Sequence, residues 1–162
     1  MEPRQQRIMD AVEARMKTIL AANGYQTDLG QSILIDRPQI VKPDGSIGSP
    51  PVDPLEMPCL LIRDLTDEIS EESTGTHRHR LAIELEVQTQ SSTGVSADKI
   101  ARRMAADVLK AISIDTTWGG LADWTFFKVP AIEKISLQGD ITFVAAIVRI
   151  VVEYETTAWQ AE

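Results

Sequence analysis

The sequence predicts an α+β fold: a mainly antiparallel sheet with two helices packed on one face and a long C-terminal strand. Two segments, residues 4–22 and 97–112, repeat apolar residues at helical spacing. Residues 77–90 alternate apolar and polar side chains with a period of two, which is typical of a half-buried strand. The order helix, strands, helix, strands favours helices gathered on one face of an antiparallel sheet.

Residues 141–157 form the longest predicted strand. Its even-numbered positions, from Val144 to Tyr154, are apolar and suit a core. Its odd-numbered positions begin apolar and become charged towards the end of the segment. Strands usually have about 5–6 residues. We therefore expect this one to extend past its own sheet or to contact a neighbouring subunit.

The first half of the chain contains a proline-rich stretch. The first helix is expected to stop at Asn23-Gly24, because glycine closes many helices in the left-handed conformation. Short strands are predicted at residues 32–35 and 39–41. Residues 42–58 hold five of the eight prolines, which predicts an extended loop or arm. Two interpretations stay open: an arm laid on another subunit, or a mobile surface loop.

The second half is predicted to add most of the sheet. Ser96 is expected to cap the second helix at its N-terminus. If the strand at 77–90 pairs with the last strand, Arg149 lies on the same face as Glu84 and Glu86, and opposite charges offset one another. The other expected elements are strands at 59–63, 126–129 and 132–138, an acidic solvated loop at 64–76, and a turn at Gly139-Asp140 that makes the last two strands a hairpin.

Length and charge restrict the class of protein. The 162 residues fit one domain, spanning residues 1–162. The formal net charge of -8 argues against a general nucleic-acid binder. There is no secretory signal and no apolar run of about 20 residues, so no membrane association is expected. The single cysteine, Cys59, is expected to be a buried free thiol.

No catalytic, cofactor-binding or metal site is predicted. His77 and His79 share a strand face, but no third ligand is near them and the flanking arginines repel a cation. Cys59 lacks the sequence context of a nucleophile. Glu84 and Glu86 fit a solvated or salt-bridged surface better than a catalytic pair. Phosphate-binding glycine loops are also absent from the sequence. We therefore do not expect an enzyme.

The chain resembles the tail terminator (tail completion) proteins of long-tailed bacteriophages along nearly its whole length. The segments that carry the resemblance are, in order, Ala21-Ala22-Asn23-Gly24, the proline-led strand at 58–62 (PCLLI), residues 80–87 (RLAIELEV) before an amphipathic helix, residues 115–122 (DTTWGGLA) and the closing residues 152–156 (VEYET). The arm at 42–58 is longer than in a minimal member, so its contacts do not follow from the resemblance.

The resemblance implies a virion structural protein, made in the cytoplasm of the host bacterium, that forms a ring at the neck end of the tail. The ring, expected to be a hexamer, would cap the tail tube, stop its polymerisation and join the head through a connector protein. DNA would pass through without being read. The alternatives are another head–tail connector or tail-tube protein, or a soluble ligand-binding α+β domain.

Head-to-tail rings need two unlike, complementary surfaces on each subunit. The arm and the odd-numbered face of the last strand are the candidates. The expected subunit-interface residues are Ile47, Val52, Leu55, Glu84, Glu86, Phe143, Ile147, Arg149 and Val151.

Overall fold

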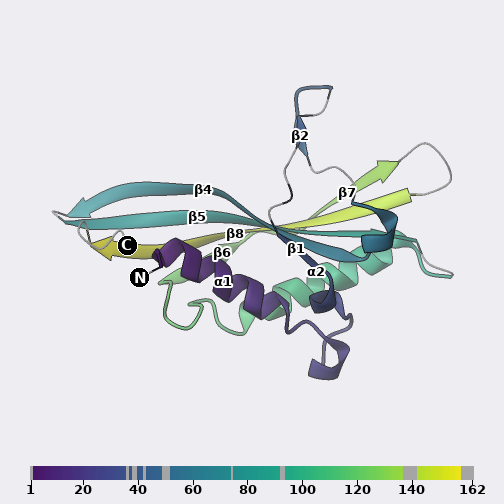
Figure 1. The fold of residues 1–162 in the computed structure, drawn as a ribbon, viewed down its shortest axis with the longest axis horizontal. Helices are drawn as coiled ribbons and strands as arrows, with labels where there is room; N and C mark the ends of the chain where they lie inside the picture. Colours follow the sequence, from purple (N-terminus) through teal and green to yellow (C-terminus); the bar gives the residue numbers. More distant parts are fainter. Residues whose placement is uncertain are drawn as a thin grey trace.

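The computed structural model describes residues 2–35, 37, 40–41, 43–48, 52–73, 75–91, 94–136 and 142–157. It confirms the α+β fold, with two α-helices on one face of a mostly antiparallel six-stranded sheet (Figure 1). The turn predicted at Gly139-Asp140 lies outside the described residues. The elements are α1 (Arg4–Met16), β1 (Ile33–Ile35), β2 (Ile40–Val41), β3 (Ile47–Gly48), β4 (Cys59–Ser73), β5 (Thr76–Gln90), α2 (Ala97–Ser113), β6 (Trp124–Phe127), β7 (Ala131–Ser136) and β8 (Thr142–Thr157), with short 3₁₀ turns at Ala21–Asn23, Leu29–Gln31 and Pro54–Glu56.

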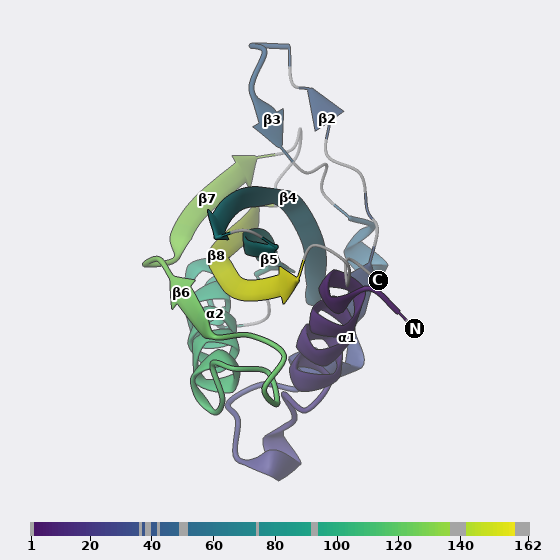
Figure 2. The same ribbon diagram turned by 90° about the vertical axis from the view of Figure 1, so that its left-hand side faces the viewer.

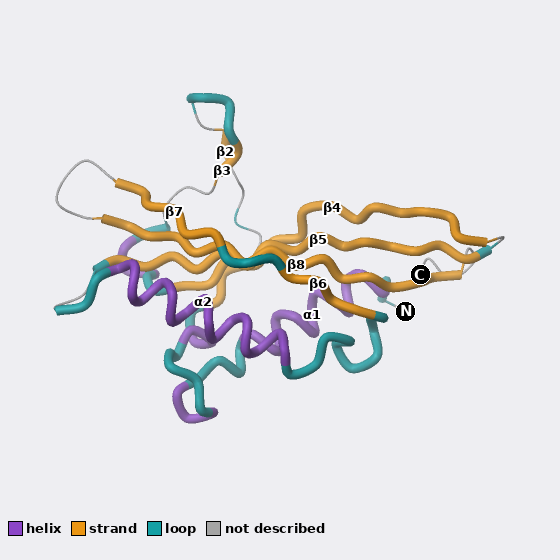
Figure 3. The backbone as a smooth tube through the Cα atoms, turned by 180° about the vertical axis from the view of Figure 1, so that it is seen from behind, coloured by secondary structure: helices purple, strands orange, loops and turns teal. Residues whose placement is uncertain are grey.

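Three long antiparallel strands, β4, β5 and β8, make the centre of the sheet. The strand order is β1-β4-β5-β8-β6, and β7 also pairs with β8. β1 runs parallel to β4, whereas every other pair in this sheet is antiparallel. β6 and β7 follow one another along the outer edge of β8 (Figure 3). The predicted pairing of the last two strands is thereby confirmed.

The core lies between the sheet and the two helices, which sit side by side beneath it (Figure 2). The even positions of β8 face the helices, as their apolar pattern predicts, and Val144, Val148 and Val152 are almost fully buried. The opposite face of the sheet, here called the far face, presents Arg63, Glu84 and the odd positions of β8. The small β2–β3 hairpin projects from the far face (Figures 1 and 2).

The first helix is shorter than predicted. α1 ends at Met16, and Gly24, in the left-handed conformation at φ 83°, closes the 3₁₀ turn that follows rather than the α-helix. The early end of α1 is explained by the close approach of Gly30 to residues 17–19. The Gly30 N–H donates to the Ile19 carbonyl at 2.9 Å, and a Cβ added at Gly30 would lie 2.5 Å from the Lys17 carbonyl oxygen. The chain therefore leaves the helix to pack against Gly30.

The prediction of an acidic loop at residues 64–76 is wrong, because β4 continues to Ser73. A β-bulge at Asp64–Thr66 separates its two halves. Beyond the bulge, the acidic strand lies against the basic start of β5, with Glu68 opposite Arg80. Opposite charges on neighbouring strands are stabilising. The β4–β5 hairpin consequently reaches past the start of α1 (Figure 1).

A tight turn after α2 is organised by Asp115. Its carboxylate accepts hydrogen bonds from the Thr117 hydroxyl (2.6 Å), the Gly119 N–H (2.7 Å) and the Thr117 N–H (2.8 Å). These bonds, first of all the one from the hydroxyl, lower the pKa of Asp115 from 3.8 to about 2. The turn sets Trp118, at φ 53°, over the core, where its indole N–H donates to the Thr125 hydroxyl at 2.8 Å.

We expect Asp115→Asn to change the acid dependence of stability. The folded pKa lies below the unfolded one, so the carboxylate's contribution is complete above the unfolded value and is lost as the pH falls towards about 2. Urea unfolding measured across this range should show the wild-type advantage over Asp115→Asn shrinking with acidity. Parallel pH curves for the two proteins would show that the carboxylate's charge does not organise the turn.

Candidate subunit interface

Large apolar side chains are exposed at the outer edge of the sheet, on β6 and the residues after it. Trp124 is 53% exposed, Phe126 47%, Phe127 50% and Val129 92%. These four residues are called the aromatic patch. The register places Trp124 and Phe126 on the far face, opposite Glu153 and Val151, and Phe127 on the helix side. Exposed apolar patches of this kind mark interaction sites.

The odd positions of β8 predicted as an interface border this patch. Ile147 and Val151 are half-buried on the far face, and Val151 lies directly opposite Phe126. Arg149 stands between them, with 59% of its side chain exposed. A guanidinium beside exposed aromatic rings is a combination enriched in protein interfaces. These residues therefore share the far face with Trp124 and Phe126 of the aromatic patch.

Three other predicted interface residues are buried within the subunit. Glu84 is 1% exposed, Glu86 2% and Phe143 3%. Glu84 and Glu86 do share the far face with Arg149, as their alternation predicts: Glu84 lies opposite Arg149, whose Nε donates to Glu84 Oε2 at 3.0 Å. Their side chains, however, are not at the surface of the subunit, because further polar groups enclose them.

Arg63 of β4 completes this buried polar network. Its Nη1 donates to Glu86 Oε2 at 2.7 Å and to Glu84 Oε1 at 3.2 Å, and Gln88 Nε2 donates to Glu86 Oε1 at 2.8 Å. Two carboxylates and two guanidinium groups thus balance in charge, which offsets the cost of burying them. Arg63 is not among the residues predicted from the sequence. Its position two residues after Leu61 would have placed it on the same face once β4 was paired with β5.

The proline-rich arm crosses the far face above this network. Arg63 Nε donates to the Arg37 carbonyl at 2.9 Å, and the Val52 N–H donates to Gln88 Oε1 at 2.9 Å. Buried side chains of the sheet therefore hold the backbone before the arm, at Arg37, and within the arm, at Val52. The segment predicted as an extended loop or arm includes two short regular elements, β3 and a 3₁₀ turn. β2 and β3 pair before it returns to the sheet.

The arm's predicted contact residues have different environments. Val52 is half-buried where the arm meets the sheet, whereas Leu55 is 93% exposed. The backbone of Ile47 pairs with Val41 in the small hairpin, and its side chain lies outside the described residues. Val41 is itself 73% exposed. The arm therefore contacts the sheet at Val52 and exposes the apolar side chain of Leu55 to solvent.

Within the described ranges, no group of three or more metal-ligating side chains comes together. His79 instead joins Asp67, Tyr154 and Thr156 on the helix side of the sheet. Its Nδ1 lies 2.9 Å from Asp67 Oδ2, its Nε2 lies 2.8 Å from Thr156 Oγ1, and its ring stacks on Tyr154 at 4.5 Å.

Tyr154 shares the same carboxylate oxygen, since its hydroxyl donates to Asp67 Oδ2 at 2.8 Å. Burial raises the pKa of Tyr154 above its ordinary value, and the bond to Asp67 raises it further. The acid thus serves two donors on neighbouring strands and ties the end of the sheet together. We interpret this cluster as a structural polar anchor.

We expect Tyr154→Phe to lower the free energy of unfolding by about 1–2 kcal/mol, because Asp67 loses a donor in a buried setting. Tyr25→Phe is the matched control. The Tyr25 hydroxyl is buried and has no hydrogen-bond partner in the described part of the chain, so its removal should not destabilise the fold. Urea unfolding of both variants checks this difference. Equal losses of unfolding free energy in the two variants would show that the hydrogen bond from Tyr154 to Asp67 does not stabilise the fold.

Cys59 is buried, as predicted, and burial raises the pKa of its thiol to about 12. Such a thiol is a poor nucleophile.

A pocket of about 200 Å³ between α1 and the sheet is smaller than the roughly 300–1,000 Å³ of typical ligand sites. Within the described residues, neither helix combines the length and apolar composition that crossing a membrane requires.

No protein-family model matches this chain, and no curated protein is significantly similar to it.

Proposed function

We propose that this protein is a structural subunit of a long-tailed bacteriophage. In this proposal, six copies form a ring that caps the tail tube, terminates its polymerisation and provides the surface for joining the head. The protein is made in the host cytoplasm, becomes part of the virion at the neck end of the tail, and catalyses no reaction. Its resemblance to tail terminators, along nearly the whole chain, supports this assignment.

The observation that carries the proposal is the aromatic patch beside Ile147, Arg149 and Val151. Leaving several large apolar side chains in water is unfavourable, and an interface would bury them. A ring also needs a second, unlike surface. Leu55 of the arm and Val41 just before it are exposed and apolar, and in this proposal they contact the aromatic patch of the next subunit.

The proposed partners are the tail-tube protein on one side of the ring and a head–tail connector protein on the other. DNA passes through the lumen without sequence-specific binding. The net charge of -8 supports passage rather than binding, because acidic surfaces repel phosphates.

Electron microscopy of phage particles that lack this protein tests the assignment. Tails much longer than those of the parent phage are expected if the protein terminates the tube. Tails of normal length detached from heads would instead make it a connector. Complete particles with attached tails would contradict both assignments. Restoring the wild-type protein should return the tails to their normal length.

A further inference from the structure

Among the described residues, no strand pairs with the outer edge of β4 over most of its length. β1 pairs with β4 only from Leu60 to Ile62, and no described strand lies beside β4 between Asp64 and Ser73. Unpaired N–H and C=O groups along such an edge are a template for another strand. This edge is on the opposite side of the sheet from β6 and the aromatic patch.

The register shows which backbone groups face outwards. The Leu60 N–H donates to the Ser32 carbonyl at 2.9 Å, so this position of β4 points away from β5. In an antiparallel ladder this direction alternates. Followed through the bulge at Asp64–Thr66, the alternation points the N–H groups of Asp67 and Ile69 away from β5. The Ile69 side chain is also 62% exposed.

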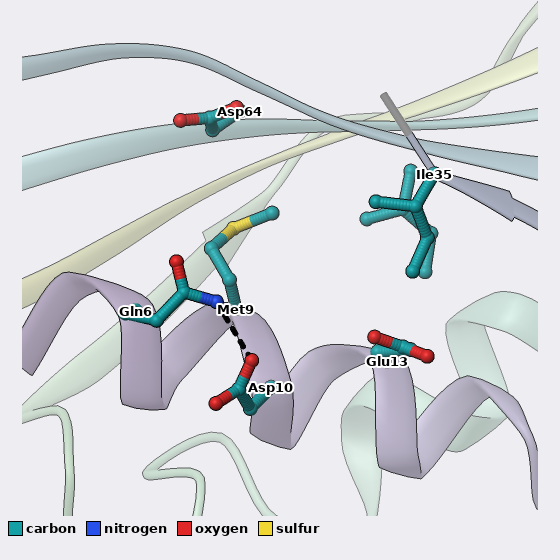
Figure 4. Close-up of a pocket in the computed structure, with 7 residues that line it drawn as sticks. Gln6, Met9, Asp10, Glu13, Ile35 and Asp64 are labelled. Carbon is teal, nitrogen blue, oxygen red and sulfur yellow. Dashed lines mark hydrogen bonds between the residues drawn. The ribbon is translucent and has the colours of Figure 1, made fainter. Parts of the chain in front are cut away.

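A pocket of about 200 Å³ lies at the Asp64 end of this edge, where β1 leaves β4 (Figure 4). It separates side chains of α1 from Asp64 and Ile35 on the strands. The pocket combines three apolar and three acidic side chains with one amide. Its lining is Met9, Ile35, Ile62, Asp10, Glu13, Asp64 and Gln6.

Two of the three acidic side chains of the pocket have a hydrogen-bond or ion-pair partner. Asp10 accepts a hydrogen bond from Gln6, and Glu13 forms an ion pair with Lys17. The Asp64 carboxylate has no hydrogen-bond or ion-pair partner among the described residues. A long aliphatic side chain that ends in a cation fits this lining, because its stem can contact Met9 and Ile35 while its charge meets Asp64.

We propose that the free edge of β4 binds an extended segment of a partner protein, which adds a strand to the sheet and places a Lys or Arg side chain in the pocket. Strand addition of this kind takes affinity from the backbone and specificity from side-chain pockets. The acids along β4 disfavour pairing with β4 of a second copy, since like charges would face each other. The partner is therefore a different, basic segment, and the proposal does not depend on the ring.

The test uses the full-length protein and a fluorescein-labelled short peptide in which Lys alternates with Val. Fluorescence anisotropy should show binding that weakens with ionic strength. Ile69→Pro removes an outward donor and should weaken binding about tenfold or more, whereas Ile69→Thr keeps the donor and should bind nearly as well. Asp64→Asn should weaken binding about fivefold at low salt, and Asp123→Asn, which removes an exposed acid at the other edge, should not.

Two further readouts make the outcome decisive. Near-ultraviolet circular dichroism must show native packing for each variant, and β4 amides must gain protection from hydrogen exchange when the peptide binds. Absence of peptide binding would overturn the proposal. Equal affinity of natively folded Ile69→Pro, or equal affinity of a peptide in which Glu replaces Lys, would also overturn it.

Discussion

Replacing Arg63 with Met is expected to lower the free energy of unfolding by about 3–5 kcal/mol. The Arg63 side chain is 6% exposed and contacts Glu84 and Glu86, whose side chains are 2% and 3% exposed. Without it, two carboxylates share a buried site with one remaining cation, Arg149. The variant also removes the bond from Arg63 Nε to the Arg37 carbonyl, which holds the chain just before the arm. Denaturant unfolding followed by circular dichroism measures the loss.

Two controls separate the network from a general effect of losing an arginine. Arg37→Met breaks the exposed ion pair with Glu56 and should cost less than about 1 kcal/mol. Adding Glu86→Gln to Arg63→Met removes one uncompensated charge and should recover part of the lost stability. A loss below about 1 kcal/mol for Arg63→Met itself would show that the network contributes little to the fold.

The double variant Trp124→Ser/Phe126→Ser is expected to abolish self-association while the subunit stays folded. Both side chains are about half exposed on the far face. Their removal should therefore cost the fold less stability than it costs an interface that buries them. Aromatic residues at the centre of an interface commonly contribute about 2 kcal/mol or more each, which is roughly a thirtyfold change in affinity. Light scattering after size-exclusion chromatography gives the mass of the assembly.

Ile114→Ser is the matched control, since Ile114 is 63% exposed at the end of α2 and lies outside the aromatic patch. It should leave the assembly unchanged. Unaltered assembly of the double variant would exclude the patch as the interface. Arg149→Glu is a less specific probe, because it would set a carboxylate beside the buried carboxylate of Glu84 and so affect folding as well.

The sequence predicted those parts of the fold that local patterns specify. The alternation in residues 81–87 identified β5, and the apolar even positions of β8 identified its buried face. The Ser96 hydroxyl accepts from the Lys99 N–H, as expected of an N-cap. The same alternation placed Glu84, Glu86 and Arg149 on one face before the pairing of their strands was known, and the register confirms it.

The errors have a common physical cause, which is contact between residues distant in sequence. The distal half of β4 is too acidic to be recognised as a strand by itself, and its extended form follows from its pairing with β5 across the ladder. The burial of Glu84 and Glu86 depends on Arg63 and on the arm, whose path over the far face no local pattern reveals. The aromatic patch was likewise missed, because exposure follows from β6 being an edge strand.

Native mass spectrometry of the purified protein, alone and mixed with purified tail tubes, tests the central claim most directly. We expect one closed stoichiometry, a hexamer, in at least one of these two conditions, and its loss in Trp124→Ser/Phe126→Ser. A protein that stays monomeric both alone and with tail tubes present would contradict the proposal that it forms a ring.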